Sequence, residues 1–279
     1  MLFRSDPLKS ALNLFRRLPP EEVESTFRSI ALLREDLAPE LLQHMEFPLR
    51  KGMDSTTKRE FILSDFNANG ESYRSPWSNK YCPPISDGEY PSPQIRSLEE
   101  KANFLFDKYR EMYYGGGVSS VYLWSNDANI CGCFLILKEV PDGDDALTFG
   151  SWHSLHLIEI IPSRTEKKAE YRLTTTIQLY LTLRNNVVGT VKQNGTLTRQ
   201  SSSIMEYEND EDHLKNIGQM IEQMENFVRS NLDMLYMSKN QETVDMIRIL
   251  HPSDLPKRSL LAELSSKMKS VRSEERRVG

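Results

Sequence analysis

Apolar runs are short and cysteines are few in this chain of 279 residues. No apolar stretch approaches the roughly 20 residues that a helix needs to cross a bilayer, and the first residues do not form the apolar core of a secretory signal. Cys82, Cys131 and Cys133 are too few and too unevenly spaced for a disulfide framework. These absences predict a protein of the cytoplasm, where thiols stay reduced.

Motifs for catalysis and metal binding are also absent from the sequence. Cys131 and Cys133 have no second cysteine pair, so we expect small buried thiols there and no metal site. His153 and His156 fall on a predicted strand, where residues three apart face opposite sides. The glycines at 115–117 follow a predicted helix and precede a strand, which reverses the order found in phosphate-binding loops. We therefore expect neither an enzyme nor a cofactor.

Residues 1–60 show the spacing of three short helices, which predicts a helical hairpin or small bundle. Asp6 and Pro7 are typical of a helix start, and Pro19 with Pro20 separates the first helix from the second. The predicted inward-facing residues are Leu8, Ala11, Leu12, Phe15 and Leu18 in the first helix, Val23, Phe27, Ile30 and Leu33 or Leu32 in the second, and Leu41 and Leu42 in the third.

Residues 61–200 divide into a turn-rich segment and a set of strands. Repeated prolines argue against regular structure through much of 61–100, and a helix is predicted from Leu98 to Tyr113. Between 118 and 200, β-branched and aromatic stretches alternate with turn residues, which predicts a five-stranded antiparallel meander. The stretches are "VSSVYLW", "ICGCFLILK", "LTFGSWHSLHLIEII", "AEYRLTTTIQLYLTL" and "VVGTVKQNGTLTRQ".

A long amphipathic helix is predicted within residues 213–250. Its apolar residues recur every three to four positions and form one stripe of about 25 residues. An antiparallel sheet crossed by one such helix gives an α+β fold. The stripe comprises Leu214, Ile217, Ile221, Met224, Val228 with Phe227, Leu232 and Leu235.

The C-terminal segment 256–279 is basic, although the chain as a whole is acidic. Seven basic and three acidic residues follow Pro256, so this tail carries +4 and the remainder carries −9 of the total of −5. Leu260, Leu264 and Met268 stand at i, i+4 and i+8, which predicts a narrow apolar line on an amphipathic tail helix. Such a helix can dock into the groove of an acidic partner or pack on its own domain, and the pattern leaves both possibilities open.

The stretch "SDFNANGESYRSPWSN", residues 64–79, has the beginning of a calcium-binding loop. Asp65, Asn67 and Asn69 occupy ligand positions 1, 3 and 5, but Pro76 stands at position 12, where such a loop needs a bidentate glutamate. We therefore expect no calcium site, and a calcium-regulated scaffold remains as an alternative from another functional class.

Several longer motifs occur in one order along the chain. They are "LNLFRRLPPEEVE", "ESYRSPWSNKY", "YGGGVSSVYLW", "GTLTRQ" and "NIGQMIEQMENFVRSNLDMLY". Together they resemble the beta subunit family of the F-actin capping protein, over about residues 5–268. The family's usual "CDYNRDGDSYRSPWSN" is changed here at Ser64, Ala68, Asn69 and Glu71, and the ending "SVRSEERRVG" also departs from the family, as expected of a divergent member.

The resemblance implies an obligate heterodimer with a similarly folded alpha subunit, in which two sheets join into one beneath two antiparallel long helices. Such a dimer caps the barbed ends of actin filaments independently of calcium, with no cofactor and no nucleic acid. It works in the cytoplasm and the cytoskeleton. On this resemblance, the actin-binding residues of the tail are Leu260, Leu264 and Met268, with Arg258 and Lys267.

The resemblance also assigns roles outside the tail. Arg229, in "ENFVRSNL", matches a basic position associated with phosphoinositide or actin contact. The N-terminal helices match the family's stalk, where capping regulators bind, and the filament of dynactin is a related target. The alternative is a structural adaptor subunit of an actin-related filament complex that has lost capping activity. The implied divisions are a stalk at 1–60, an irregular segment with a helix at 61–117, the sheet at 118–200, the long helix at 213–250 and the tail at 256–279.

Overall fold

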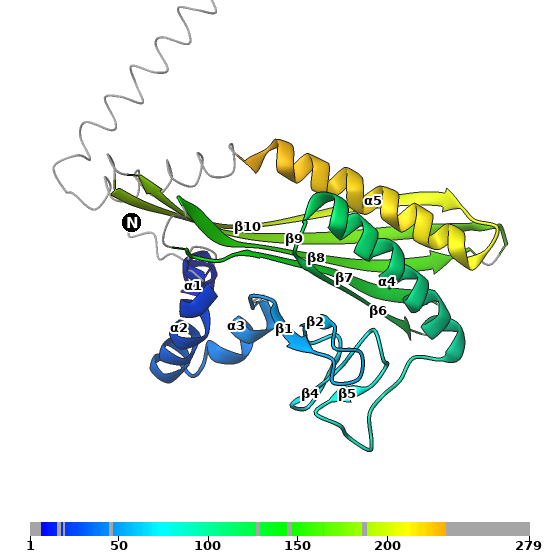
Figure 1. Ribbon diagram of the computed structural model, residues 1–279, viewed down its shortest axis with the longest axis horizontal. Coiled ribbons are helices and arrows are strands. Elements are labelled where there is room, and N and C mark those ends of the chain that lie inside the picture. The colour runs from blue at the N-terminus through cyan, green and yellow to red at the C-terminus, as the bar shows by residue number, and fades with distance from the viewer. Residues whose placement is uncertain are drawn as a thin grey trace, which may run out of the picture. The chain divides into compact units, whose positions relative to one another are not determined.

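The computed structural model describes residues 7–15, 18, 20–44, 47–126, 129–143, 147–163, 165–185 and 189–232. These residues form three N-terminal helices, a group of short strands, and a five-stranded antiparallel sheet that carries two helices (Figure 1). The predicted α+β class is confirmed. The second half of the predicted long helix and the whole predicted tail helix lie outside the described residues. No described helix is long and apolar enough to cross a membrane.

Helices α1 (Pro7–Phe15), α2 (Pro20–Leu33) and α3 (Ala38–His44) occupy the segment predicted to be a small bundle. Their apolar residues recur at helical spacing, and one side of each helix packs into a shared core. The buried residues of this core are Phe15, Val23 and Leu41, and Leu8, Ala11, Leu12, Leu18, Phe27, Ile30 and Leu37 pack against them.

Three leucines of these helices face solvent, and their predicted inward orientation was wrong. Leu32 and Leu33 are each 81% exposed, and Leu42 is 54% exposed. Leu37, in the turn between α2 and α3, packs against the core in place of Leu32 and Leu33. The end of α2 therefore presents apolar side chains that the described part of the chain does not cover.

A five-stranded antiparallel meander forms the main sheet, as predicted. Strands that follow one another in the chain are also neighbours in the sheet, so the order is β10-β9-β8-β7-β6. The last strand continues to Glu206, beyond the predicted end at Gln200, because its pairing with the preceding strand continues to Lys168. The strands are β6 (Val118–Asn126), β7 (Asn129–Val140), β8 (Thr148–Pro162), β9 (Lys168–Asn185) and β10 (Gly189–Glu206).

Helices α4 (Pro93–Tyr113) and α5 (Asp210–Ser230) lie side by side over one face of this sheet (Figure 1). The prediction of a single crossing helix was therefore incomplete. Both helices are amphipathic, and both contribute to one buried core with the strands. The helical members of that core are Ile95, Leu98, Ala102 and Phe106 from α4 and Leu214, Ile217, Met220 and Ile221 from α5.

Both helices begin earlier than the apolar spacing predicted, because capping residues precede the apolar stripe. Ser92 caps α4, since its hydroxyl accepts a 3.3 Å hydrogen bond from the backbone N–H of Ile95, and Pro93 occupies the first helical turn. Asn209 caps α5 by accepting from the N–H groups of Glu211 and Asp212 at 2.9 and 3.2 Å. The acidic residues that follow Asn209 favour a helix N-terminus.

Side chains alternate between the two faces of the sheet, and this separates two histidines as predicted. Nε2 of His156 lies 3.0 Å from Glu225 of α5, whereas Nδ1 of His153 accepts from the backbone N–H of Leu49 on the other face. Cys133 is also on that other face, where it is a fully buried free thiol. A second core on this face comprises Ile62, Tyr122, Cys133, Leu135 and Leu137.

Short strands occupy part of the segment that we expected to be irregular. The prolines lie after β4 and after β5, so they do not interrupt any hydrogen-bonded ladder. These strands are β3 (Ala68–Asn69), β4 (Ser72–Arg74) and β5 (Tyr81–Cys82), which form one small sheet, and β2 (Glu60–Leu63). The other residues between 61 and 92 form no helix or strand. β2 pairs with β1 (Arg50–Met53), which lies in the segment 1–60 that we predicted to be helical.

The "ESYRSPWSNKY" segment is joined to α4 by a buried ion pair. Arg74 donates hydrogen bonds of 2.7 and 2.8 Å to the two carboxylate oxygens of Glu99, which is fully buried. Arg96 and the backbone N–H of Leu123 donate to the same carboxylate. We call Arg74, Arg96 and Glu99 the clasp, because they connect this segment, α4 and β6.

Asn67 supports the main chain with both polar atoms of its side-chain amide, including the oxygen that a calcium loop would use as a ligand. Its Nδ2 donates to the carbonyl oxygens of Ile62 and Arg74 at 3.3 and 2.9 Å. Its Oδ1 accepts a 2.9 Å hydrogen bond from the N–H of Ser64. This geometry argues against the calcium-regulated alternative, since the side-chain oxygen of the central candidate ligand already holds the turn.

Candidate binding site

Arg229, in the last turn of α5, lies over two tyrosines on the helix-covered side of the sheet. Its guanidinium carbon is 4.6 Å from the ring centre of Tyr113 and 5.9 Å from that of Tyr114. The arginine side chain is 26% exposed, and it donates a 2.8 Å hydrogen bond to Oδ1 of Asn226. The arrangement presents a positive charge to solvent on an aromatic support.

Glu225, one helical turn before Arg229, is fully buried. Arg229 approaches its carboxylate at 3.5 Å, and four closer groups surround it. We call Glu225, these four residues and Arg229 the Glu225 network. The four groups are the hydroxyls of Tyr109 (2.6 Å), Tyr114 (2.7 Å) and Ser154 (2.9 Å), and Nε2 of His156 (3.0 Å).

The network keeps the Glu225 carboxyl ionised. Burial alone would raise its pKa, but the hydrogen bonds from His156, Tyr109 and Tyr114 outweigh burial and lower the pKa to about 2. Burial and the neighbouring carboxylate raise the pKa of both tyrosine hydroxyls, so they remain protonated donors. A permanent negative charge therefore lies directly beneath a partly exposed arginine.

The outer edge of β10 is a second candidate surface. β10 pairs with β9 over its whole length, and in the described part of the chain no strand pairs with its other side. An edge of this length offers backbone donors and acceptors to a strand of another chain. Ile204, which is 70% exposed, adds an apolar side chain near one end of this edge.

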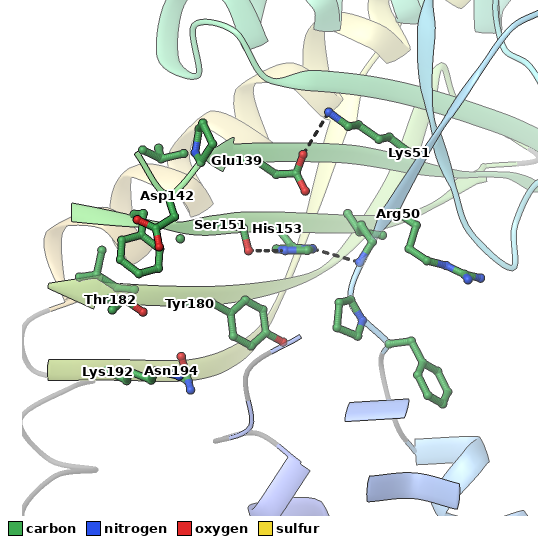
Figure 2. A pocket seen from close by; sticks show the side chains of 18 of the residues that line it. Arg50, Lys51, Glu139, Asp142, Ser151, His153, Tyr180, Thr182, Lys192 and Asn194 are labelled. Atoms are coloured by element: carbon green, nitrogen blue, oxygen red, sulfur yellow. Dashed lines mark hydrogen bonds and ion pairs between the residues drawn. The ribbon is translucent and has the colours of Figure 1, made fainter. Parts of the chain in front are cut away.

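A hollow of about 1210 Å³ lies on the sheet face opposite α4 and α5 (Figure 2). Phe27 of α2 lines it on one side, and Lys192 and Asn194 of β10 line it on another. Within it, Nζ of Lys51 forms an ion pair of 3.1 Å with Glu139. The hollow therefore reaches from the N-terminal helices to the edge strand of the sheet.

His153 forms part of the floor of this hollow. Its Nδ1 accepts a 3.0 Å hydrogen bond from the N–H of Leu49, and its Nε2 is 2.8 Å from the hydroxyl of Ser151 (Figure 2). The ring of Tyr180 packs edge-on against the imidazole at 5.4 Å. Burial lowers the pKa of His153 to about 4, so the imidazole is neutral at physiological pH.

Of the predicted site residues, only Arg229 lies in the described part of the chain. Leu260, Leu264, Met268, Arg258 and Lys267 lie outside the described residues. Sequence reasoning missed the remainder of the Glu225 network, although a glutamate between the buried Ile221 and Val228 of α5 is a visible signal. Among the residues that the structure describes, no three His, Cys, Asp or Glu side chains are placed to hold a metal ion.

Comparison with known proteins gives one consistent result. The family "F-actin capping protein, beta subunit" matches residues 8–244. The chain is similar to the F-actin-capping protein subunit beta of Drosophila melanogaster, with 42% identity over 85% of this chain and 86% of the relative. The protein of the same name from Dictyostelium discoideum is 37% identical over 91% and 94%, and that from Arabidopsis thaliana is 39% identical over 86% and 95%.

One solved structure has a weaker likeness. The homodimeric actin capping protein alpha subunit from Plasmodium berghei matches with a TM-score of 0.47 and 18% identity, over 88% of this chain and 96% of that chain. This likeness is too low to carry an argument.

Proposed function

The chain belongs to the F-actin capping protein beta subunit family, and on this premise we propose that it caps the barbed ends of actin filaments as a heterodimer with an alpha subunit. The observation that carries the proposal is the family match over residues 8–244, which extends from α1 to beyond α5. Proteins of this family bind actin in the cytoskeleton and are not enzymes. Co-expression with an alpha subunit should yield one stable complex, and recovery of the two chains separately would contradict the proposal.

We place the alpha subunit along the edge of β10. Two features support this choice: the length of that edge, and the exposed Ile204 near one end of it. Because Lys192 and Asn194 belong both to β10 and to the hollow in Figure 2, a partner strand on this edge would also pass the mouth of the hollow. The alpha subunit therefore contributes groups to the hollow in this proposal.

A pair of proline variants tests the edge contact. Backbone N–H groups of successive strand residues point to opposite sides, so only one of Gln200→Pro and Ser201→Pro removes a donor needed by β9. The other removes a donor only from the outer edge. That outer variant should fold but fail to co-purify with the alpha subunit. Equal recovery of the complex with both variants and with the wild-type chain would place the interface elsewhere.

The tail residues carry the actin contact in our proposal. Leu260, Leu264 and Met268 would enter an apolar cleft on a terminal actin subunit, with Arg258 and Lys267 near its acidic groups. Their spacing and the tail charge of +4 support this assignment. A tail contact linked to a second contact on the body multiplies affinity without new surface.

Leu264→Asp tests the tail contact in a seeded actin elongation assay. Burying a leucine is worth roughly 1.5–3 kcal/mol, so the variant should weaken capping by about tenfold or more. Ser265→Asp is the matched control, because it adds the same charge beside the apolar line. Equal capping by both variants would remove the tail from the proposal.

Arg229 is the second contact that we propose for the filament end. Its partial exposure and its aromatic support favour binding of an acidic group. Phosphoinositides, regulators on the N-terminal helices and the dynactin filament are further partners that rest on the family resemblance. Arg229→Ala should speed dissociation from barbed ends, and Arg172→Ala, an exposed arginine on the other face of the sheet, should not.

A further inference from the structure

The geometry points to Glu225 and Tyr114 as positioning residues, which hold the Arg229 guanidinium in one orientation for an acidic group of the filament end. This inference rests on the proposed filament contact of Arg229. Glu225 is fully buried and Tyr114 is 8% exposed, so neither can form the contact itself. Both residues act through Arg229.

Glu225 does not need Arg229 to satisfy its hydrogen bonds. Each carboxylate oxygen already has two close partners, at 2.6 and 2.7 Å for Oε2 and at 2.9 and 3.0 Å for Oε1. The arginine stands farther away, at 3.5 Å, beyond the range of a strong charge-assisted hydrogen bond. The carboxylate therefore attracts Arg229 electrostatically without using up its N–H groups.

The guanidinium is held on several sides by weak contacts. Nη1 is 3.5 Å from the hydroxyl of Tyr114, and Nη2 is 3.4 Å from that of Tyr109. The rings of Tyr113 and Tyr114 support the guanidinium face. Among the described residues, the only side-chain hydrogen bond of Arg229 shorter than these goes to Asn226, at 2.8 Å. Other N–H groups of the fork thus stay available to an incoming acidic group.

This arrangement reduces the entropic cost of binding. A free arginine side chain has many rotamers, and fixing them opposes the formation of any contact. Here the buried charge and the two rings limit those rotamers before a partner arrives. Tyr114 also connects the Glu225 carboxylate to the Arg229 guanidinium, because its hydroxyl donates to Glu225 and its ring supports Arg229. Loss of that hydroxyl should loosen Arg229 while the ring stays in place.

A double-mutant cycle on the heterodimer separates positioning from a purely structural role. The variants are Tyr114→Phe, Arg229→Ala and both together, and the readout is the dissociation rate from barbed ends of single filaments. Tyr114→Phe alone should speed dissociation about fivefold, which equals roughly 1 kcal/mol, a typical value for one hydrogen bond. In the Arg229→Ala background the same change should have no further effect.

Matched variants keep this test interpretable. Tyr90→Phe removes a hydroxyl from an exposed tyrosine whose ring packs on Tyr81, outside the Glu225 network, so dissociation should stay at the wild-type rate. Tyr109→Phe repeats the test if Tyr114→Phe does not fold. Equal acceleration by Tyr114→Phe with and without Arg229 would overturn the inference alone. No effect of Arg229→Ala itself would overturn the proposed filament contact on which the inference rests.

Discussion

Two buried glutamates, Glu99 on α4 and Glu225 on α5, have their negative charges stabilised by different kinds of groups. Both side chains are fully buried, where an unpaired carboxylate would be very costly. Glu99 meets the guanidinium groups of Arg74 and Arg96, whose side chains are only 6% and 12% exposed. Glu225 meets hydroxyls and an imidazole, and the nearest guanidinium, on Arg229, is 26% exposed. The exposure of the counter-charge, more than burial of the acid, distinguishes a structural site from a candidate binding site.

Arg74→Ala should give the largest effect on stability. It leaves the buried Glu99 carboxylate with one guanidinium fewer, and breaking a buried ion pair typically lowers the free energy of unfolding by about 3–5 kcal/mol. Urea denaturation of the heterodimer measures this change. Arg28→Ala removes an exposed pair with Glu24 and should cost no more than about 1 kcal/mol. Similar losses of stability for both variants would contradict the distinction between buried and exposed ion pairs.

His153 extends the comparison to a buried neutral group on the other face of the sheet. Its pKa of about 4 lies below the usual 6.5, so between pH 6.5 and 4 the unfolded chain binds a proton that the folded chain does not. Stability should therefore fall as the pH falls through this window, by about 3 kcal/mol in total.

His153→Gln tests this pH dependence, because glutamine does not titrate. The variant should lose the extra slope of stability against pH between 6.5 and 4.5. Measurements stop at pH 4.5, since Glu225, with a pKa of about 2, begins to lose its own contribution below that value. Parallel curves for the variant and the wild-type protein would show that His153 is not held neutral by burial.

Tyr109→Phe should have a smaller effect on stability than Arg74→Ala. It removes one of four close donors to Glu225, and a hydrogen bond to a charged group contributes about 1.5–3 kcal/mol. The other donors remain, so we expect the lower end of this range in thermal or urea unfolding. A loss as large as that of Arg74→Ala would mean that the Glu225 network serves mainly to hold the fold together.

Lys101→Ala should give the smallest effect. Lys101 pairs with Glu211 at 2.6 Å and joins α4 to α5, but the two side chains are 53% and 68% exposed. Solvent screens such a pair, and we expect a change below about 0.5 kcal/mol in the free energy of unfolding. A loss above about 2 kcal/mol would show that surface ion pairs, and not the shared buried core, fix α4 against α5.

Much of the fold follows from local pattern. Alternating β-branched and aromatic residues predicted all five strands of the main sheet, because side-chain alternation is fixed by strand geometry. The pattern also placed His153 and His156 on opposite faces. It could not show that α4 shares a sheet face with α5, since an amphipathic helix does not reveal what it packs against. The pattern also predicted the first residues of α4 and α5 too late in the chain, because Ser92 and Asn209 cap these helices ahead of their apolar stripes.

The site depends on contacts that no local pattern contains. Tyr109 is 116 residues from Glu225 in the chain, and His156 is 69 residues from it. Only the packing of α4, β8 and α5 brings these groups together. The "SDFNANGESYRSPWSN" segment shows the reverse case. Its first residues have the pattern of a calcium-binding loop, whereas in the structure Asn67 supports the main chain and Arg74 belongs to the clasp.

Imaging of single actin filaments with both ends visible tests the central claim most directly. With the purified heterodimer present, barbed-end growth should stop while pointed-end growth continues, and the Arg229→Ala complex should leave barbed ends sooner than the wild-type complex. Unchanged barbed-end growth at saturating heterodimer would contradict the account.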